Sequence, residues 1–262
     1  TKYAGHAEQN ASSLKKEIFN QHAVLVVAGG DGTVNEVING LASVGRLDTP
    51  IGLIPVGTVN LLGRELKLPS DPRLLAQVIS YFNFGRITLG QIASRRQTRL
   101  FLITAGVGFD ARAVLRVSRR LKIFSGKLAF IVAGIWEYVF GKRVQYQVIV
   151  DGEALVARSI LFANGKYYAG GMSWAPAADI ERPTLEVGIF AGAGRLRIPT
   201  YVVAFMAGRL QQLHDVIVRS STEIDLTGPS NEPVQADGDI VAFLPVNISV
   251  APKRARVFAS NR

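Results

Sequence analysis

Hydrophobic positions follow two different patterns along this chain, and the change lies near residue 84. In the first part, short apolar runs at 24–28 and 51–55 alternate with stretches in which apolar residues recur every three or four positions. Uninterrupted β-branched runs are typical of strands covered on both faces, and the longer period is typical of amphipathic helices. Residues 1–84 therefore predict an α/β domain with a parallel sheet. Its predicted helices span residues 5–19, 34–42 and 72–81.

From residue 85 onward the pattern predicts paired strands joined by short turns. Apolar runs at 144–150 and 154–162 flank Asp151 and Gly152, a dipeptide favoured in type I′ hairpins. Repeated short strands of this kind are typical of a β-sandwich, here interrupted by one predicted helix. We expect residues 85–262 to form this second domain. The helix is predicted at 199–213, and the other strands at 86–92, 98–105, 185–190, 216–220, 223–226, 240–244 and 248–250.

Charge divides the chain at the same place. Residues 1–84 contain seven Lys/Arg and seven Asp/Glu, whereas the remainder contains twenty-three and thirteen, so the net charge of +10 lies in the second part. The densest basic stretch is residues 112–143, where Arg112, Arg116 and Arg120 would share one face of a helix. A basic amphipathic helix suits an anionic membrane surface, and a solvated face on a basic protein is the other interpretation.

Composition and missing motifs exclude several function classes. The chain has no cysteine, which removes disulfides and thiolate metal sites, and its histidines stand far apart at positions 6, 22 and 214. No uninterrupted apolar run reaches the roughly eighteen residues of a membrane span. No Walker-type phosphate loop occurs. The basic residues lack interleaved aromatic side chains, so nucleic acid is not an expected partner.

A glycine turn follows the first predicted strand and precedes a helix. Residues 29–33 read Gly-Gly-Asp-Gly-Thr. The glycines can adopt positive φ and admit a polyphosphate, while the first N–H groups of the helix point at the anion. Thr33 and Glu36 have capping-box spacing, which predicts where the helix begins. A carboxylate beside an anion is repulsive unless it accepts hydrogen bonds or binds a metal ion, so we expect Asp31 to have a positioned role.

A second glycine turn, at residues 57–60, follows the strand predicted at 51–55. Adjacent parallel strands present their C-terminal loops at one crevice, where ligands bind in open α/β sheets. The two turns are therefore expected to form opposite walls of one nucleotide site. A third cluster at 106–111 imitates the dinucleotide fingerprint, but the acid expected about twenty residues later is missing.

Taken in chain order, the segments 29–36, 57–60, 105–111 and 235–239 resemble the diacylglycerol kinase catalytic domain family, which includes bacterial lipid kinases and sphingosine and ceramide kinases. The resemblance extends over essentially the whole chain. It implies an N-terminal α/β domain, a C-terminal β-sandwich, ATP with Mg²⁺ in the cleft between them, and a lipid hydroxyl as acceptor. The family's first strand and its loop are absent, so we expect them to precede Thr1.

The resemblance also implies site residues. Asp237 and Asp239 would hold the catalytic base; the family usually has Asp-Gly-Glu there, so which of the two is the base stays open. The residues implied to contact or lie near ATP are Thr1, Gly29, Gly30, Asp31, Gly32, Thr33, Val34, Asn35, Gly57, Thr58 and Asn60.

An ancillary magnesium site is a further implication, and here the chain departs from the family. Similar bacterial proteins place Asp-Gly where this chain has Arg182 and Pro183, and arginine cannot ligate a cation. Asp179, Glu181 and Thr184 remain as candidate ligands. The nucleotide's own Mg²⁺ is less affected, because phosphates and one or two carboxylates hold it.

Together these features predict a lipid kinase that is cytoplasmic and peripherally associated with an anionic membrane, with homodimerisation left open. The acyl chains would bind in the sandwich domain. Two alternatives remain: an NAD kinase-like phosphotransferase with a soluble acceptor, and a non-catalytic basic protein that binds nucleotide or nucleic acid. The aromatic and apolar residues expected around the acyl chains are Phe162, Tyr167, Tyr168, Met172 and Trp174.

Overall fold

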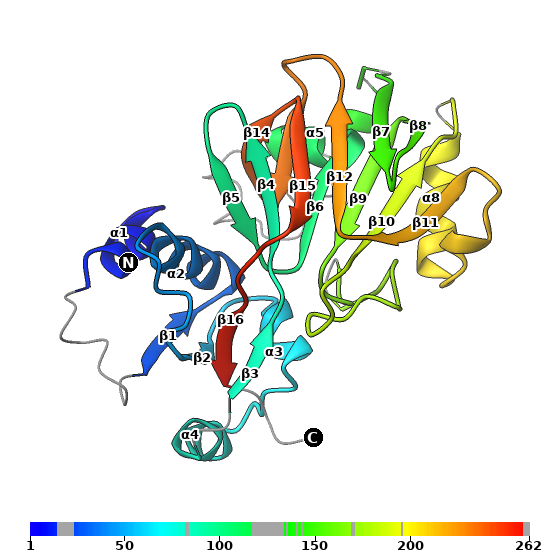
Figure 1. The fold of residues 1–262 in the computed structure, drawn as a ribbon. Coiled ribbons are helices and arrows are strands. Elements are labelled where there is room, and N and C mark those ends of the chain that lie inside the picture. Colours follow the sequence, from blue (N-terminus) through cyan, green and yellow to red (C-terminus); the bar gives the residue numbers. More distant parts are fainter. Residues whose placement is uncertain are drawn as a thin grey trace.

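The computed structural model shows an α/β layer packed below a two-sheet sandwich (Figure 1). Its helices are α1 (His6–Ser12), α2 (Asp31–Ser43), α3 (Leu61–Glu65), α4 (Pro72–Ser80), α5 (Phe109–Arg116), α8 (Arg197–Met206) and the 3₁₀ turn η2 (Leu210–Gln212). The structure describes residues 1–14, 24–81, 84–116, 134, 136–139, 141–142, 144–168, 171–194 and 196–258.

The first sheet has four strands in the order β1 (Leu25–Gly29), β2 (Ile51–Pro55), β16 (Ala255–Phe258) and β3 (Phe84–Ile87). β1 runs parallel to β2, as expected; β16 is also parallel to β2, whereas β3 is antiparallel to β16. The sheet therefore receives a strand from near the end of the chain. The helix α2 packs on this sheet through Val34, Val37, Ile38 and Leu41, which recur at helical spacing and are all buried.

Two six-stranded antiparallel sheets form the sandwich, which confirms the expected fold class. Their inward-facing residues, such as Tyr146 and Val148 on one sheet and Phe162 and Val187 on the other, make one buried core. One sheet runs β11 (Val216–Ser221), β10 (Leu185–Phe190), β9 (Ser159–Ala163), β6 (Thr104–Val107), β13 (Pro233–Ala236), β14 (Asp239–Phe243). The other runs β5 (Thr98–Phe101), β4 (Gly90–Ser94), β15 (Val246–Val250), β12 (Glu223–Thr227), β7 (Tyr146–Val150), β8 (Glu153–Ala157).

The hairpin predicted from Asp151 and Gly152 is confirmed. It joins β7 to β8, and its two central residues have φ values of 51° and 81°. Positive φ at both positions is what a type I′ turn requires. Other boundaries differ from the prediction: α3, β13 and β16 were not expected, and the strands predicted at 86–92, 98–105 and 154–162 are each divided in two.

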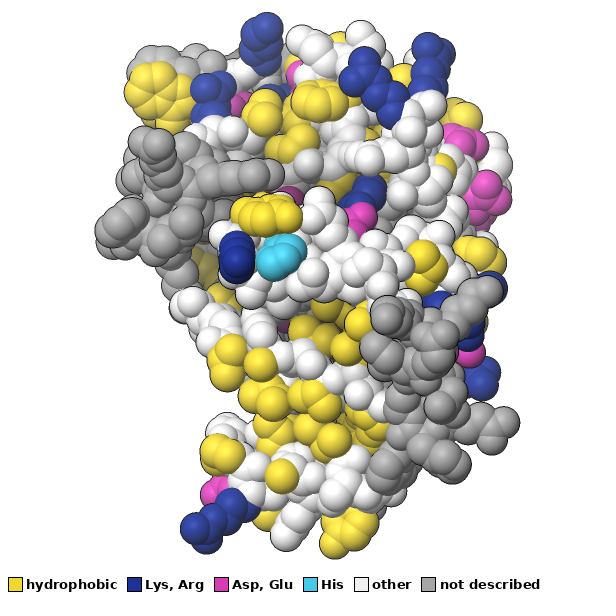
Figure 2. Space-filling model, turned by 90° about the vertical axis from the view of Figure 1, so that its left-hand side faces the viewer, with side chains coloured by type: hydrophobic (Ala, Val, Ile, Leu, Met, Phe, Trp, Pro, Cys, Tyr) yellow, Lys and Arg dark blue, Asp and Glu magenta, His cyan; other side chains and the backbone are white. Residues whose placement is uncertain are grey.

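Charge is distributed unevenly over the surface. Figure 2 shows Lys and Arg side chains gathered along the top of one face, over the sandwich, and hydrophobic side chains gathered near the bottom, over the first sheet. The basic helix predicted within 112–143 is described only as far as Arg116, and most of the stretch lies outside the described residues. None of the described helices is both long enough and apolar enough to cross a bilayer.

Candidate active site

The first glycine turn is shaped by close packing. α2 begins at Asp31, and its N-cap Gly30 has φ −90° and offers no side chain to cap the helix. A Cβ on Gly57 would lie 2.5 Å from Gly30 Cα, so the two glycine turns touch backbone to backbone. A Cβ on Gly32, by contrast, would meet nothing within 4 Å. None of Gly29, Gly30 and Gly32 uses the positive φ that glycine permits.

Asp31 ties the two turns together. Its carboxylate accepts hydrogen bonds from the backbone N–H groups of Leu61 (2.9 Å) and Leu62 (3.0 Å), the first residues of α3. Asn60, with φ 52°, donates its side-chain amide to the carbonyls of Pro55 (2.8 Å) and Gly57 (2.6 Å). Both polar side chains therefore satisfy the backbone of the second turn and fix its position beside the first.

Glu36 has a different partner from the one its spacing predicts. The capping-box interpretation was wrong, because α2 starts two residues before Thr33. The Glu36 carboxylate instead accepts the N–H groups of Gly5 (2.7 Å) and Ala7 (3.1 Å) at the start of α1. It satisfies donors that a helix N-terminus leaves unpaired. The exposed Thr1 lies on this same N-terminal segment, ahead of α1.

Asp237 lies between α2 and the segment 102–104 that connects β5 to β6. Its Oδ2 accepts from Leu102 N (2.7 Å) and from the Asn35 amide (2.8 Å), and its Oδ1 accepts from Ile103 N (2.9 Å) and Thr104 N (3.1 Å). These bonds explain why the strand predicted at 98–105 breaks into β5 and β6. Burial raises the pKa of Asp237, and its four donors oppose that rise. Asp239, two residues later, is exposed at the start of β14.

A polar cleft of about 450 Å³ contains this carboxylate pair. Gly32 of the first glycine turn and Asn35 of α2 line it from one side. Asp237, Gly238 and Asp239 line it from the other side. Glu8 and Glu36 also line it, and Arg99 is the only cation among the described lining residues.

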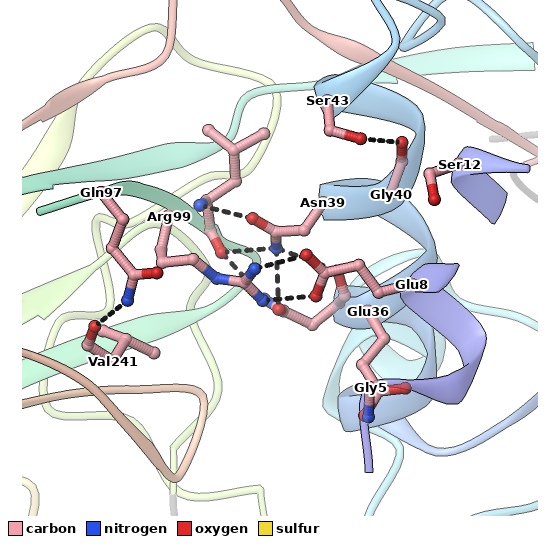
Figure 3. A network of polar contacts seen from close by, with 12 residues as sticks. Gly5, Glu8, Ser12, Glu36, Asn39, Gly40, Ser43, Gln97, Arg99 and Val241 are labelled. Carbon is pink, nitrogen blue, oxygen red and sulfur yellow. Dashed lines mark hydrogen bonds and ion pairs between the residues drawn. The ribbon is translucent and has the colours of Figure 1, made fainter. Parts of the chain in front are cut away.

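Arg99 of β5 and Glu8 of α1 form the side of the cleft drawn in Figure 3. Their two hydrogen bonds measure 2.6 and 2.9 Å, a bidentate ion pair between the sandwich and the α/β layer. Behind it the buried Asn39 amide binds both Leu100 O (3.0 Å) and Asn35 Oδ1 (2.9 Å), which orients Asn35 toward Asp237. Sequence reasoning missed the pair, since its members stand 91 positions apart.

A chain of hydrogen bonds leads from the carboxylate turn to a second cavity. Gly238 N donates to Gln235 Oε1 (3.0 Å), Gln235 Nε2 donates to Asp110 (2.7 Å), and Asp110 also accepts from the Tyr168 hydroxyl (2.8 Å). Burial raises the pKa of Asp110, and burial together with Asp110 raises the pKa of Tyr168. Asp110 belongs to the glycine cluster at 106–111.

The second cavity, of about 230 Å³, lies between the β11–β14 sheet and the helices α5 and α8. Of the residues expected around acyl chains, Tyr168 and Trp174 line this cavity, whereas Phe162 is fully buried in the sandwich core. Tyr167 and Met172 are not among its lining residues. Its other apolar walls are Leu161, Phe190, Val202, Phe205 and Leu210.

Two arginines of the expected membrane-binding helix pair with Glu137, which lines this cavity together with Arg112. Arg112 Nε binds Glu137 at 2.6 Å, and its Nη1 binds Glu232 at 2.8 Å. Arg116 Nε binds the other oxygen of Glu137 at 2.9 Å. Glu137 is buried, so both arginines neutralise an interior carboxylate. Arg119, Arg120 and Lys122 lie outside the described residues.

The residues expected at the ancillary metal site do not form a ligand set. The Asp179 carboxylate accepts the N–H of Glu181 at 2.9 Å and faces the Arg182 guanidinium at 3.8 Å. Glu181 is exposed. In the described part of the chain, no group of three or more His, Cys, Asp or Glu side chains is placed to hold a metal ion. Asp179 and Glu181 are therefore not joined by a third such side chain around one point in the described residues.

Comparisons with known proteins agree on one family. Residues 1–92 match the model of the diacylglycerol kinase catalytic domain, and residues 103–259 match that of the YegS C-terminal NAD kinase beta sandwich-like domain. A diacylglycerol kinase of Staphylococcus carnosus is 28% identical over 235 residues, covering 89% of this chain and 75% of the relative. One of Staphylococcus saprophyticus is 27% identical over 264 residues, covering 100% and 84%.

Solved structures show the same fold. The crystal structure of a diacylglycerol kinase from Bacillus anthracis superposes with a TM-score of 0.76 at 21% identity, covering 99% of this chain and 84% of that one. An NAD kinase from Archaeoglobus fulgidus in complex with ATP superposes with a TM-score of 0.50 at 17% identity, covering 90% and 77%. With both family models matched in order along its length, the chain belongs to the family that joins a diacylglycerol kinase catalytic domain to a YegS C-terminal NAD kinase beta sandwich-like domain.

Proposed function

We propose that this kinase transfers the γ-phosphate of ATP to the hydroxyl of diacylglycerol or a related lipid. One observation carries the proposal: the polar cleft with the Asp237–Asp239 turn is joined, through Gln235 and Asp110, to an apolar cavity. A lipid acceptor needs both environments, because its hydroxyl must reach the phosphate while its chains leave water.

The first glycine turn, residues 29–33, suits the nucleotide phosphates. The N–H groups in the first turn of α2 have no side-chain cap, and the helix dipole favours an anion there. Gly32 leaves open space on the cleft side, which lets a phosphate approach the backbone. We propose that residues 29–35 hold the phosphates and that Gly57, Thr58 and Asn60 form the opposite wall.

Mg²⁺ fits this cleft better than it fits the ancillary site. A nucleotide-bound Mg²⁺ needs only one or two protein carboxylates, and Glu8, Glu36, Asp237 and Asp239 line the cleft. When bound, the ion supplies charge neutralisation on the phosphates. We assign no step to a metal at Asp179.

The carboxylate turn supplies the base. The lipid hydroxyl oxygen attacks the γ-phosphorus, the bond from that phosphorus to the bridging oxygen breaks, ADP leaves, and the hydroxyl proton passes to the Asp237–Asp239 pair. Asp237 Oδ1 and Oδ2 each already accept two hydrogen bonds. Asp237 can therefore take a proton only if it loses one of these hydrogen bonds. Asp239 is exposed and has the more open approach.

A substrate panel tests the proposal. Purified protein would be given labelled ATP, Mg²⁺ and one acceptor at a time: short-chain diacylglycerol, ceramide, sphingoid base, phosphatidylglycerol or NAD. We expect label in one of the lipids. Transfer to NAD alone would support the soluble-acceptor alternative, and no transfer to any acceptor would contradict a kinase with this substrate range.

A further inference from the structure

The helix α8 is apolar on its outer as well as its inner side. Residues 201–206 read Tyr-Val-Val-Ala-Phe-Met without a polar interruption beyond the tyrosine hydroxyl. Val203 is 66% exposed and Met206 72% exposed, and Leu196, just before the helix, is 79% exposed. No residue of α8 is buried. Arg197 and Thr200 in the first turn of α8 are polar, whereas the rest of the helix exposes large apolar side chains, and such a surface usually marks a contact with an apolar partner.

The inner side of α8 is a wall of the apolar cavity. Ile198, Tyr201, Val202 and Phe205 line that cavity, opposite Leu161 and Trp174 of the sandwich. The helix lies at the far side of the sandwich from α1 and α2 (Figure 1). One short helix therefore separates the cavity from the surroundings and presents hydrophobic side chains to both.

Trp136 and Val139 extend the apolar surface beside the cavity. Both are exposed, while their neighbours Glu137 and Tyr138 line the cavity itself. The pattern seen on α8 is thus repeated on a second segment of the rim, with cavity-lining and outward-facing side chains side by side.

The charges around this surface are positive. Residues 196–214, which include α8, contain Arg197 and Arg209 and no Asp or Glu. The described lining of the cavity holds four cations, Arg112, Lys142, Arg158 and Arg197, against two acids, Asp110 and Glu137. Arg197 is itself paired with Asp215 at 3.1 Å, whereas Lys142 and Arg209 are exposed. An apolar surface surrounded by cations matches an anionic bilayer, which offers hydrocarbon beneath a negative headgroup layer.

We infer that the outer face of α8 docks on an anionic membrane and that the lipid acceptor enters the cavity from the bilayer beside this helix. The inference rests on the proposed lipid kinase function and adds the surface through which the substrate arrives. It also replaces Arg112 and Arg116 as the docking cations, since both are paired with Glu137.

The test compares two double variants. Val203→Asp with Met206→Asp places two carboxylates on the outer face of α8. Ile149→Asp with Val156→Asp makes the same chemical change on the exposed face of β7 and β8, in the other sheet. Because all four side chains are well exposed, both variants should fold, and thermal melting with an ATP-binding measurement would confirm it.

Vesicles of phosphatidylglycerol and phosphatidylcholine serve as the probe, with bound protein measured by co-sedimentation. We expect the α8 variant to lose binding at least tenfold, while the β7–β8 variant binds like the wild type. Phosphorylation of short-chain diacylglycerol in detergent micelles should persist in both variants, because that assay needs no bilayer. If the wild type itself phosphorylates no diacylglycerol in micelles, that result would count against the kinase proposal alone.

Three results would overturn the docking surface. These are equal vesicle binding by the two variants, no vesicle binding by the wild type, and a wild-type dimer that light scattering shows to become a monomer in the α8 variant. The last result would assign this face to a second copy of the chain.

Discussion

Asn35 of α2 donates a hydrogen bond of 2.8 Å to Asp237, although the two residues stand 202 positions apart. The bond joins α2, which follows the first glycine turn, to the carboxylate turn of the sandwich. Asn39 fixes the Asn35 amide from behind, and the backbone of residues 102–104 fixes Asp237. The two halves of the polar cleft are therefore held in register by side chains that also line it.

Asp31→Ala should weaken ATP binding roughly tenfold or more and lower the free energy of unfolding by about 1–3 kcal/mol. The reason is that two N–H groups of α3 lose their acceptor and the second turn loses its tie to the first. Calorimetric titration with ATP–Mg²⁺ and urea unfolding measure the two effects.

Asp71→Ala is the matched control for this change. Asp71 also accepts hydrogen bonds from two backbone N–H groups, here at the start of α4. Asp71 does not line the polar cleft. Its loss should cost about 1 kcal/mol of stability and leave the affinity for ATP unchanged. Equal ATP affinity in both variants and the wild type would contradict the role assigned to Asp31.

Replacement of the cleft carboxylates should separate their roles. The residue that accepts the lipid proton should lose roughly 10²-fold or more in kcat when changed to Asn, with ATP affinity retained. Asp237→Asn should in addition lower the melting temperature, because an amide cannot accept from four donors. Asp239→Asn should not, since that residue is exposed. Full turnover in both variants would remove the pair from the mechanism.

Two glycine substitutions should separate packing from ligand contact. Gly57→Ala forces a Cβ to within 2.5 Å of Gly30 Cα, so both stability and ATP affinity should fall. Gly32→Ala meets nothing in the protein, so stability should be unchanged or slightly raised while ATP affinity falls. Melting curves and ATP titrations check both variants. Wild-type affinity in Gly32→Ala would show that the phosphates bind elsewhere.

Asp110→Asn should flatten the dependence of stability on pH. Burial raises the pKa of Asp110 above its ordinary 3.8, so the folded protein holds this proton more tightly than the unfolded chain does. The stabilisation that comes from this tighter proton binding is complete at pH values below 3.8, and it is lost as the pH rises through the folded-state pKa. Urea unfolding at several pH values from 4 to 8 should show a smaller fall in the variant. An identical fall would mean that Asp110 titrates normally.

The local pattern of the sequence determined many of the helices and strands and the two glycine turns. β2 and β10 lie where the apolar runs predict them, and Asp151 with Gly152 forms the predicted hairpin, because strand burial and turn conformation depend on neighbouring residues. The sandwich as a fold class also follows from the repeated short apolar runs, whereas the assignment of strands to its two sheets does not.

Tertiary structure decided how these pieces make a site. β16 joins the first sheet from the far end of the chain, Glu36 caps α1 instead of its own helix, and Asp237 interrupts a predicted strand. Neither the Arg99–Glu8 ion pair nor the link through Gln235 to Asp110 has a local signature. Each depends on groups far apart in sequence whose hydrogen bonds form only after the sheets pack, whereas periodicity and turn preference act over a few residues.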